Sequence, residues 1–139
     1  MGQDPLFRKQ MPTTCLLDTT VIIDAINDRN GRNALLTQLI AQGTLLACCS
    51  INITEVFMGM RPQEARRTED FLESLEFYPV TRDVARIAGE LYREWRQQGL
   101  TLPLPDLTVA AVALHNGLEL ATDNARDFPM PELWLLPMP

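Results

Sequence analysis

Residues 14–26 have the sequence TCLLDTTVIIDAI, in which a short apolar run ends at an acid and a second apolar pattern begins. Residues 15–17 are apolar throughout, as is typical of a short strand buried on both faces. The two threonines at 19 and 20 can open a helix that continues to Ile26. This segment therefore predicts a strand, an acid (Asp18) at its carboxyl end, and a helix that follows directly.

The same alternation continues along the chain. Further strand-like runs lie at 45–49, 77–80, 118–122 and 133–136, and helical patterns lie at 32–42, 50–60, 62–75, 84–99 and 106–116. Strands that alternate with helices predict a parallel sheet. We therefore expect an α/β fold, with a short central parallel sheet of about four to five strands and helices on both faces. Pro79 predicts that the run at 77–80 is an edge strand.

Length and charge narrow the class of protein. A chain of 139 residues suits one domain, which we place at 11–139, and residues 1–10 are interpreted as an N-terminal tail or an expression remnant. The net charge of −6 excludes a protein that coats nucleic acid through a surplus of positive charge. Contact with RNA would therefore depend on local arginines and on bound cations.

Two further observations bear on the compartment. No apolar run approaches the ~20 residues that cross a bilayer, so we expect no membrane segment. The three cysteines lie in apolar runs without a zinc-type spacing, which favours a reducing, cytoplasmic setting.

Acidic side chains fall where the predicted strands end or the next helix begins. Asp18 follows the first strand, Glu55 lies one turn into the helix after the second, Asp106 begins a later helix, and Asp123 and Asp127 follow the fourth strand. The carboxyl ends of parallel strands meet at one edge of a sheet. Carboxylates that converge there repel one another unless a cation lies between them, and their oxygens suit Mg²⁺ or Mn²⁺. Ions held in this way can catalyse phosphodiester hydrolysis.

A purely structural interpretation stands beside this one. Asp18 and Asp106 could each cap a helix, and Asp127 could belong to an ordinary turn. Glu55 fits that interpretation less well, because its neighbours are apolar and an unpaired carboxylate among them is costly. Spacing alone therefore indicates a metal site without proving one.

Four segments, in this order, resemble motifs of the PIN-domain ribonucleases, most nearly the VapC-type toxins of bacterial toxin–antitoxin pairs. They are Leu16–Asp24, Ser50–Gly59, Pro105–Asn116 and Ala121–Phe128. The resemblance extends from Thr14 to about Leu135. It implies that Asp18, Glu55 and Asp106 bind metal and act in catalysis.

The fourth acid is left open by the same resemblance. Asn124 stands where members of the family often have an aspartate, so either Asp127 or Asp123 takes that role. The resemblance also implies that Thr20, Thr122 and Asn124 order the site through hydrogen bonds.

The function implied by the resemblance is that of a Mg²⁺-dependent (or Mn²⁺-dependent) endoribonuclease. Its substrate would be structured RNA such as tRNA, rRNA or mRNA. It would be a homodimer that a cognate antitoxin neutralises, by laying a helix on it and directing a basic side chain toward the acids. From their proximity to the motifs in the sequence, the predicted substrate contacts are Arg29, Arg32, Arg61 and Arg126.

Two alternatives to this function remain at this point. One is a PIN-like binding or regulatory module that has lost cleavage, against which the complete acid set argues. The other is cleavage of DNA, because sites of this kind hydrolyse either backbone.

Overall fold

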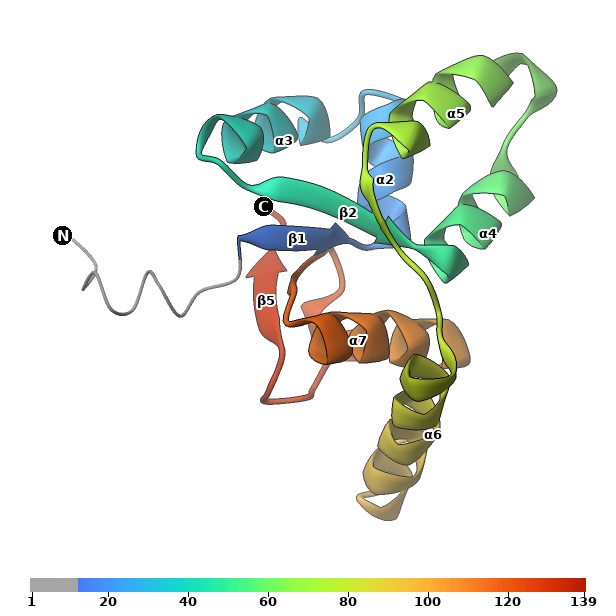
Figure 1. Cartoon of the computed structure of the whole chain (residues 1–139), viewed down its shortest axis with the longest axis vertical. Helices are drawn as coiled ribbons and strands as arrows, with labels where there is room; N and C mark the ends of the chain where they lie inside the picture. The colour runs from blue at the N-terminus through green and yellow to red at the C-terminus, as the bar shows by residue number, and fades with distance from the viewer. Residues whose placement is uncertain (1–12) are drawn as a thin grey trace, which may run out of the picture.

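The computed structural model describes residues 13–139 (Figure 1). The interpretation of residues 1–10 as a tail therefore falls outside the described residues. Within them, the predicted α/β architecture is confirmed. Five strands form one sheet, in the order β3-β2-β1-β4-β5. They are β1 (Thr14–Leu17), β2 (Leu45–Cys49), β3 (Glu76–Tyr78), β4 (Glu119–Thr122) and β5 (Trp134–Pro137).

All four strand pairs are parallel, and β1 lies in the centre. Leu16 pairs with Ala47 on one side and with Leu120 on the other, and all three residues are fully buried. Each of these three strands has at least three consecutive buried residues, as expected of a sheet covered on both faces. β3 is an edge strand, as Pro79 predicted.

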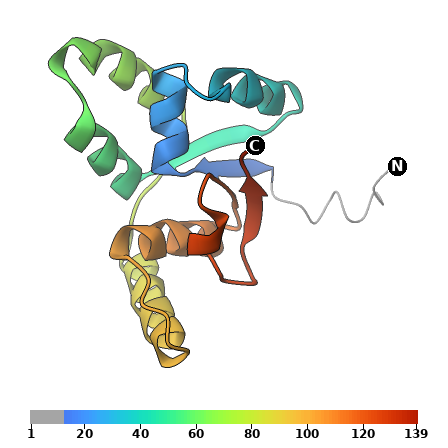
Figure 2. The ribbon, with the colours of Figure 1, turned by 180° about the vertical axis from the view of Figure 1, so that it is seen from behind.

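Helices cover both faces of the sheet (Figures 1 and 2). On one face lie α2 (Thr19–Ile26), α3 (Arg32–Ala41), α4 (Ser50–Gly59) and α5 (Ala65–Glu73), and on the other lie α6 (Arg82–Gln97) and α7 (Leu104–Asn116). Two short 3₁₀ turns complete the fold, η1 (Pro62–Glu64) and η2 (Ala125–Asp127). Buried apolar residues form one core cluster on each face of the sheet. Within residues 13–139, none of the helices is long and apolar enough to cross a membrane.

Several predicted helix boundaries differ from the structure, and the one that bears on the site is the start of α7. The last long helix, α7, begins at Leu104 and not at Asp106, because Pro105 fits the first turn, where its missing N–H is not needed. Asp106 therefore lies in the first turn and is not the N-cap. The helix ends as predicted, at Gly117, whose φ of 66° is the left-handed conformation that glycine adopts easily.

The chain order creates a switch point beside β1. It runs outward from β1 through β2 to β3, and then returns to the opposite side of β1 with β4. In open parallel sheets, ligands bind outside the carboxyl ends of the strands at such a point. In Figure 1, α2 and α4 begin at these carboxyl ends, and the N-terminal end of α7 lies below them.

Candidate active site

Asp18 lies at the carboxyl end of the central strand and is 8% exposed. Its Oδ1 accepts a hydrogen bond from the Thr19 N–H (2.9 Å), so it is the N-cap of α2. Its Oδ2 accepts a hydrogen bond from the Thr122 hydroxyl on β4 (2.8 Å). Burial raises the pKa of Asp18, these two hydrogen bonds lower it, and the charges of Glu55 and Asp123 raise it. Asp18 therefore caps a helix and also faces other acids.

Glu55 on α4 is tied to the start of α2. The Thr19 hydroxyl donates to Glu55 Oε1 (2.7 Å), and Asn52 Nδ2 donates to the Thr19 hydroxyl oxygen (3.0 Å). Asn52 is fully buried, and its Oδ1 accepts from the Cys49 N–H (2.8 Å). Neither Thr19 nor Asn52 was predicted to belong to the site. Asn52 lies three residues before Glu55, on the same helix face, and that spacing was the signal available.

Asp106 is where the acids meet. Burial raises the pKa of Asp106 to about 6, together with the negative charges of Asp18, Asp127 and Glu55, in that order. Those three carboxylates come from the end of β1, from η2 and from α4. Charges from three segments that are far apart in the sequence therefore act on Asp106.

The two candidates for the fourth acid have different surroundings. Asp127 is among the charges that act on Asp106. Asp123 instead has both carboxylate oxygens engaged: Oδ1 pairs with the Arg32 guanidinium, and Oδ2 accepts from the Thr20 hydroxyl at 3.2 Å. The charge of Asp127 therefore acts on Asp106, whereas that of Asp123 acts on Asp18 and is paired with Arg32.

The three residues predicted to order the site make different contacts. Thr122 is 1% exposed and donates to Asp18. Asn124 contributes through its backbone, because its N–H donates to the Thr122 hydroxyl oxygen (3.0 Å). Thr20 is exposed and contacts Asp123, outside the cluster around Asp106.

The predicted arginine contacts divide into two groups. Arg29, Arg61 and Arg126 are exposed, and Arg61 Nε pairs with Glu64 Oε1 at 2.8 Å. The prediction that Arg32 contacts the substrate is wrong, because Arg32 is 4% exposed and its guanidinium lies inside the protein against Asp123. RNA at the surface could not reach it.

The chemistry of the acid cluster fits a cation bound by oxygen ligands. The ion pairs found within residues 13–139 involve other acids, so the four clustered carboxylates have no cationic side chain to balance them. In the same part of the chain, no three acid, histidine or cysteine side chains are close enough to hold a metal as they stand. The carboxylate oxygens are of the type that binds Mg²⁺ or Mn²⁺. The four side chains would have to move closer together to bind such an ion.

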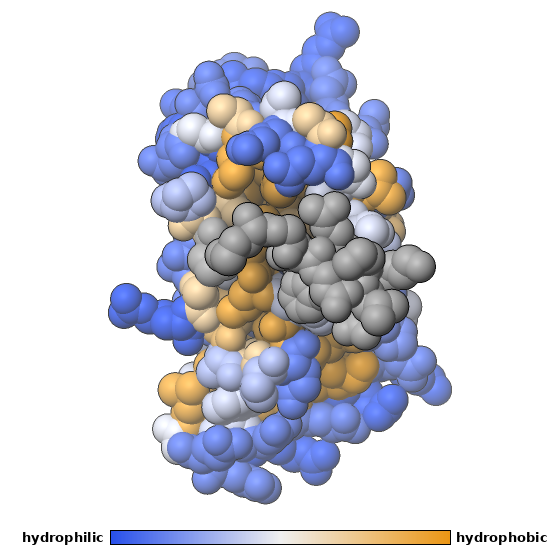
Figure 3. Space-filling view, turned by 90° about the vertical axis from the view of Figure 1, so that its left-hand side faces the viewer, coloured by the Kyte–Doolittle hydropathy of each residue, from blue (hydrophilic) through white to orange (hydrophobic). Residues whose placement is uncertain are grey.

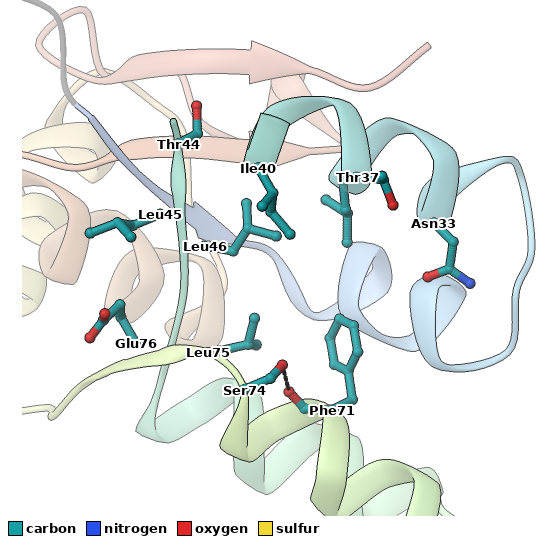
Figure 4. A pocket seen from close by; sticks show the side chains of 11 residues that line it. Asn33, Thr37, Ile40, Thr44, Leu45, Leu46, Phe71, Ser74, Leu75 and Glu76 are labelled. Atoms are coloured by element: carbon teal, nitrogen blue, oxygen red, sulfur yellow. Dashed lines mark hydrogen bonds between the residues drawn. The ribbon is translucent and has the colours of Figure 1, made fainter. Parts of the chain in front are cut away.

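A cavity of about 360 Å³, lined by both apolar and polar side chains, lies away from these acids. It is bounded by α3, by the start of β2 and by the end of α5, and Figure 4 shows Ile40, Leu46, Phe71 and Leu75 directed into it. Figure 3 shows the face that carries α3 and the start of β2, where groups of apolar side chains lie among polar ones. This cavity is at the amino ends of β2 and β3, opposite to the carboxyl ends that carry the acids.

Comparisons with known proteins agree with this geometry. The family model of the PIN domain matches residues 15–129. The chain is 34% identical over 115 residues to ribonuclease VapC19 of Mycobacterium tuberculosis, which covers 83% of this chain and 92% of that protein. It is 28% identical over 118 residues to ribonuclease VapC2 of Rickettsia felis, covering 81% and 88% respectively.

Solved structures show the same fold. A crystal structure of VapBC2 from Rickettsia felis, bound to a DNA fragment from its promoter, has a TM-score of 0.80 at 26% identity and covers 91% of this chain and 99% of that one. A toxin–antitoxin complex from Klebsiella pneumoniae has a TM-score of 0.72 at 27% identity, covering 88% and 95%. With the acids at the carboxyl ends of β1 and β4 and the family model spanning most of its length, the chain belongs to the PIN-domain family.

Proposed function

We propose that this protein is a divalent-metal-dependent endoribonuclease and the toxin of a toxin–antitoxin pair. The observation that carries the proposal is that three negative charges act on Asp106. Burial and these charges together raise the pKa of Asp106 to about 6. Such a cluster is unfavourable unless a cation occupies it. The relatives named ribonucleases support RNA as the substrate.

The residues that would hold Mg²⁺ or Mn²⁺ are Asp18, Glu55, Asp106 and Asp127. A divalent cation bound there supplies an activated water and stabilises the oxygen that leaves. The protein's own contribution is orientation, since Thr122 fixes one oxygen of Asp18 and the buried pair of Asn52 and Thr19 fixes Glu55. Partners of this kind hold carboxylate ligands in one geometry.

On the substrate side, the proposal assigns structured RNA such as tRNA, rRNA or mRNA. The protein carries a net charge of −6, so attraction for phosphate must be local. Arg29, Arg61 and Arg126 are exposed and remain the proposed contacts.

The proposed partner is a cognate antitoxin. The structures at 26% and 27% identity are of toxin–antitoxin systems. A basic antitoxin side chain placed among the unbalanced acids would occupy the position of the cation and block cleavage. The same proposal includes a homodimer. It also includes a reducing cytoplasmic setting, which is consistent with three cysteines that are free and buried.

The test is cleavage of a mixed tRNA and rRNA pool by the wild type and by Asp18→Asn, with Mg²⁺ and with excess chelator. Asp70→Asn, an exposed position on α5, is the matched control. Cleavage is expected from the wild type and from the control, with Mg²⁺ only. RNA binding without cleavage by the wild type would instead favour a PIN-like binding module.

A further inference from the structure

Arg32, the first residue of α3, is a buried cation beside the acid site. It is 4% exposed, and its Nη2 pairs with Asp123 Oδ1. Both Nη1 and Nη2 also donate to the main-chain oxygen of Pro139 (3.3 Å each), and Nη1 donates to the main-chain oxygen of Asn30 (3.2 Å). One side chain therefore joins the loop before α3, the loop after β4 and the segment that follows β5.

Burying the side chain of Arg32 in this way costs folding free energy. Among the described residues, the Nε of Arg32 is the buried side-chain polar atom left without a hydrogen-bond partner. An unpaired buried donor destabilises a protein, and the guanidinium of Arg32 is removed from water although the side chain of its partner Asp123 is 26% exposed. The position of Arg32 therefore calls for an explanation other than folding energy.

The loop that Arg32 holds is the one that supplies the site. Asp123 directly follows Thr122, whose hydroxyl donates to Asp18 (2.8 Å) and whose main-chain oxygen accepts from the Met138 N–H (3.1 Å). The same loop continues into η2, where the Asp127 N–H donates to the Asn124 main-chain oxygen (2.9 Å). Fixing Asp123 thus fixes the segment that places both Thr122 and Asp127.

We propose that Arg32 is a positioning residue of the acid site. It anchors the loop after β4, which carries Thr122 and Asp127, and it engages the carboxylate of Asp123 in an ion pair. The part of this inference that concerns metal rests on the proposed function. The part that concerns the loop does not.

The test compares the double variant Arg32→Met with Asp123→Asn against the wild type. This pair removes one positive and one negative charge, so the net charge is unchanged, and the amide exchange reports the position of the loop. Leu36→Ala is the control, because Leu36 is 3% exposed and lies one turn further along the same helix, without a polar contact to the site. Backbone amide exchange is measured in metal-free protein, and Mn²⁺ affinity is measured by calorimetry.

Faster exchange at the amides of Asn124 and Asp127 is expected in the double variant only. Its Mn²⁺ dissociation constant should rise by about tenfold or more, as when partners of metal-binding carboxylates are removed. The single variant Arg32→Lys keeps the positive charge, so it should bind Mn²⁺ more tightly than the double variant does. Leu36→Ala should lower the melting temperature and leave both the exchange and the affinity as in the wild type.

Wild-type exchange rates at Asn124 and Asp127 in the double variant would overturn the inference, and so would an equal loss of Mn²⁺ affinity in Leu36→Ala. If the wild type itself bound no Mn²⁺, the proposed function would fail, and the exchange data would still decide whether Arg32 holds the loop. If the double variant did not fold, Asp123→Asn alone breaks the same ion pair at the surface side and is measured in the same way.

Discussion

Replacing Asp106 with asparagine should stabilise the metal-free protein at neutral pH. Burial and three neighbouring carboxylates raise the pKa of Asp106 from its usual 3.8 to about 6. At pH 7 such a rise corresponds to roughly 3 kcal/mol of destabilisation. Because the side chain is only half-buried and solvent screens the charges, we expect about 1 to 2 kcal/mol.

The pH dependence of this gain has a definite sign. A carboxylate whose folded-state pKa is raised destabilises the folded protein above its unfolded pKa, so the penalty begins near pH 4 and is complete above about pH 6. For a domain of this length, the Asn variant should melt about 4 to 8 °C above the wild type at pH 7. At pH 4 the two proteins should melt together.

The assay is thermal unfolding followed by circular dichroism in chelator, from pH 4 to pH 7.5. Asp70→Asn, on the exposed face of α5, is the control and should show no such trend. Equal melting temperatures of wild type and Asp106→Asn at pH 7 would refute the reasoning. A gain that persisted unchanged at pH 4 would also refute it, because the carboxylate charge would then not be the cause.

Three further predictions follow from the same contacts. Mn²⁺ at a hundredfold excess over its dissociation constant should stabilise the wild type by about 3 kcal/mol in the same melting assay. The Asp18→Asn variant should lose most of this stabilisation. An equal stabilisation of both proteins would remove Asp18 from the site. Thr19→Val should lower the free energy of unfolding by about 1 to 3 kcal/mol in urea, because Asn52 and Glu55 both lose their partner; an unchanged urea midpoint would contradict this. Gly117→Ala should cost about 1 kcal/mol at a φ of 66°, and a stabilising effect would show that the turn tolerates a side chain.

Most of the fold could be predicted from the sequence because both faces of the sheet are covered. β1 and β2 are buried between helices, so each is a short apolar run that ends at a polar residue. The helix α6 was equally clear, because Val84, Ala88 and Leu91 share one buried face. The start of α7 was misplaced, since a proline suits either a loop or a first helical turn.

The site was predictable as a set of acids but not as a network. Strand ends bring Asp18 and Asp127 to one edge whatever the side-chain details. Arg32 was misassigned, because its partner Asp123 lies 91 residues further along the chain and only the folded sheet brings the two together. Neighbours in the sequence could not reveal that its guanidinium points inward.

The central claim is that four acids form one cation site and that Asp123 is not part of it. The most direct measurement is the anomalous scattering of a crystal of the protein soaked in Mn²⁺. The expected result is a Mn²⁺ peak bounded by the carboxylates of Asp18, Glu55, Asp106 and Asp127, with Asp123 still paired with Arg32. A peak bound by Asp123 without Asp106, or no peak among the four acids at saturating Mn²⁺, would contradict it.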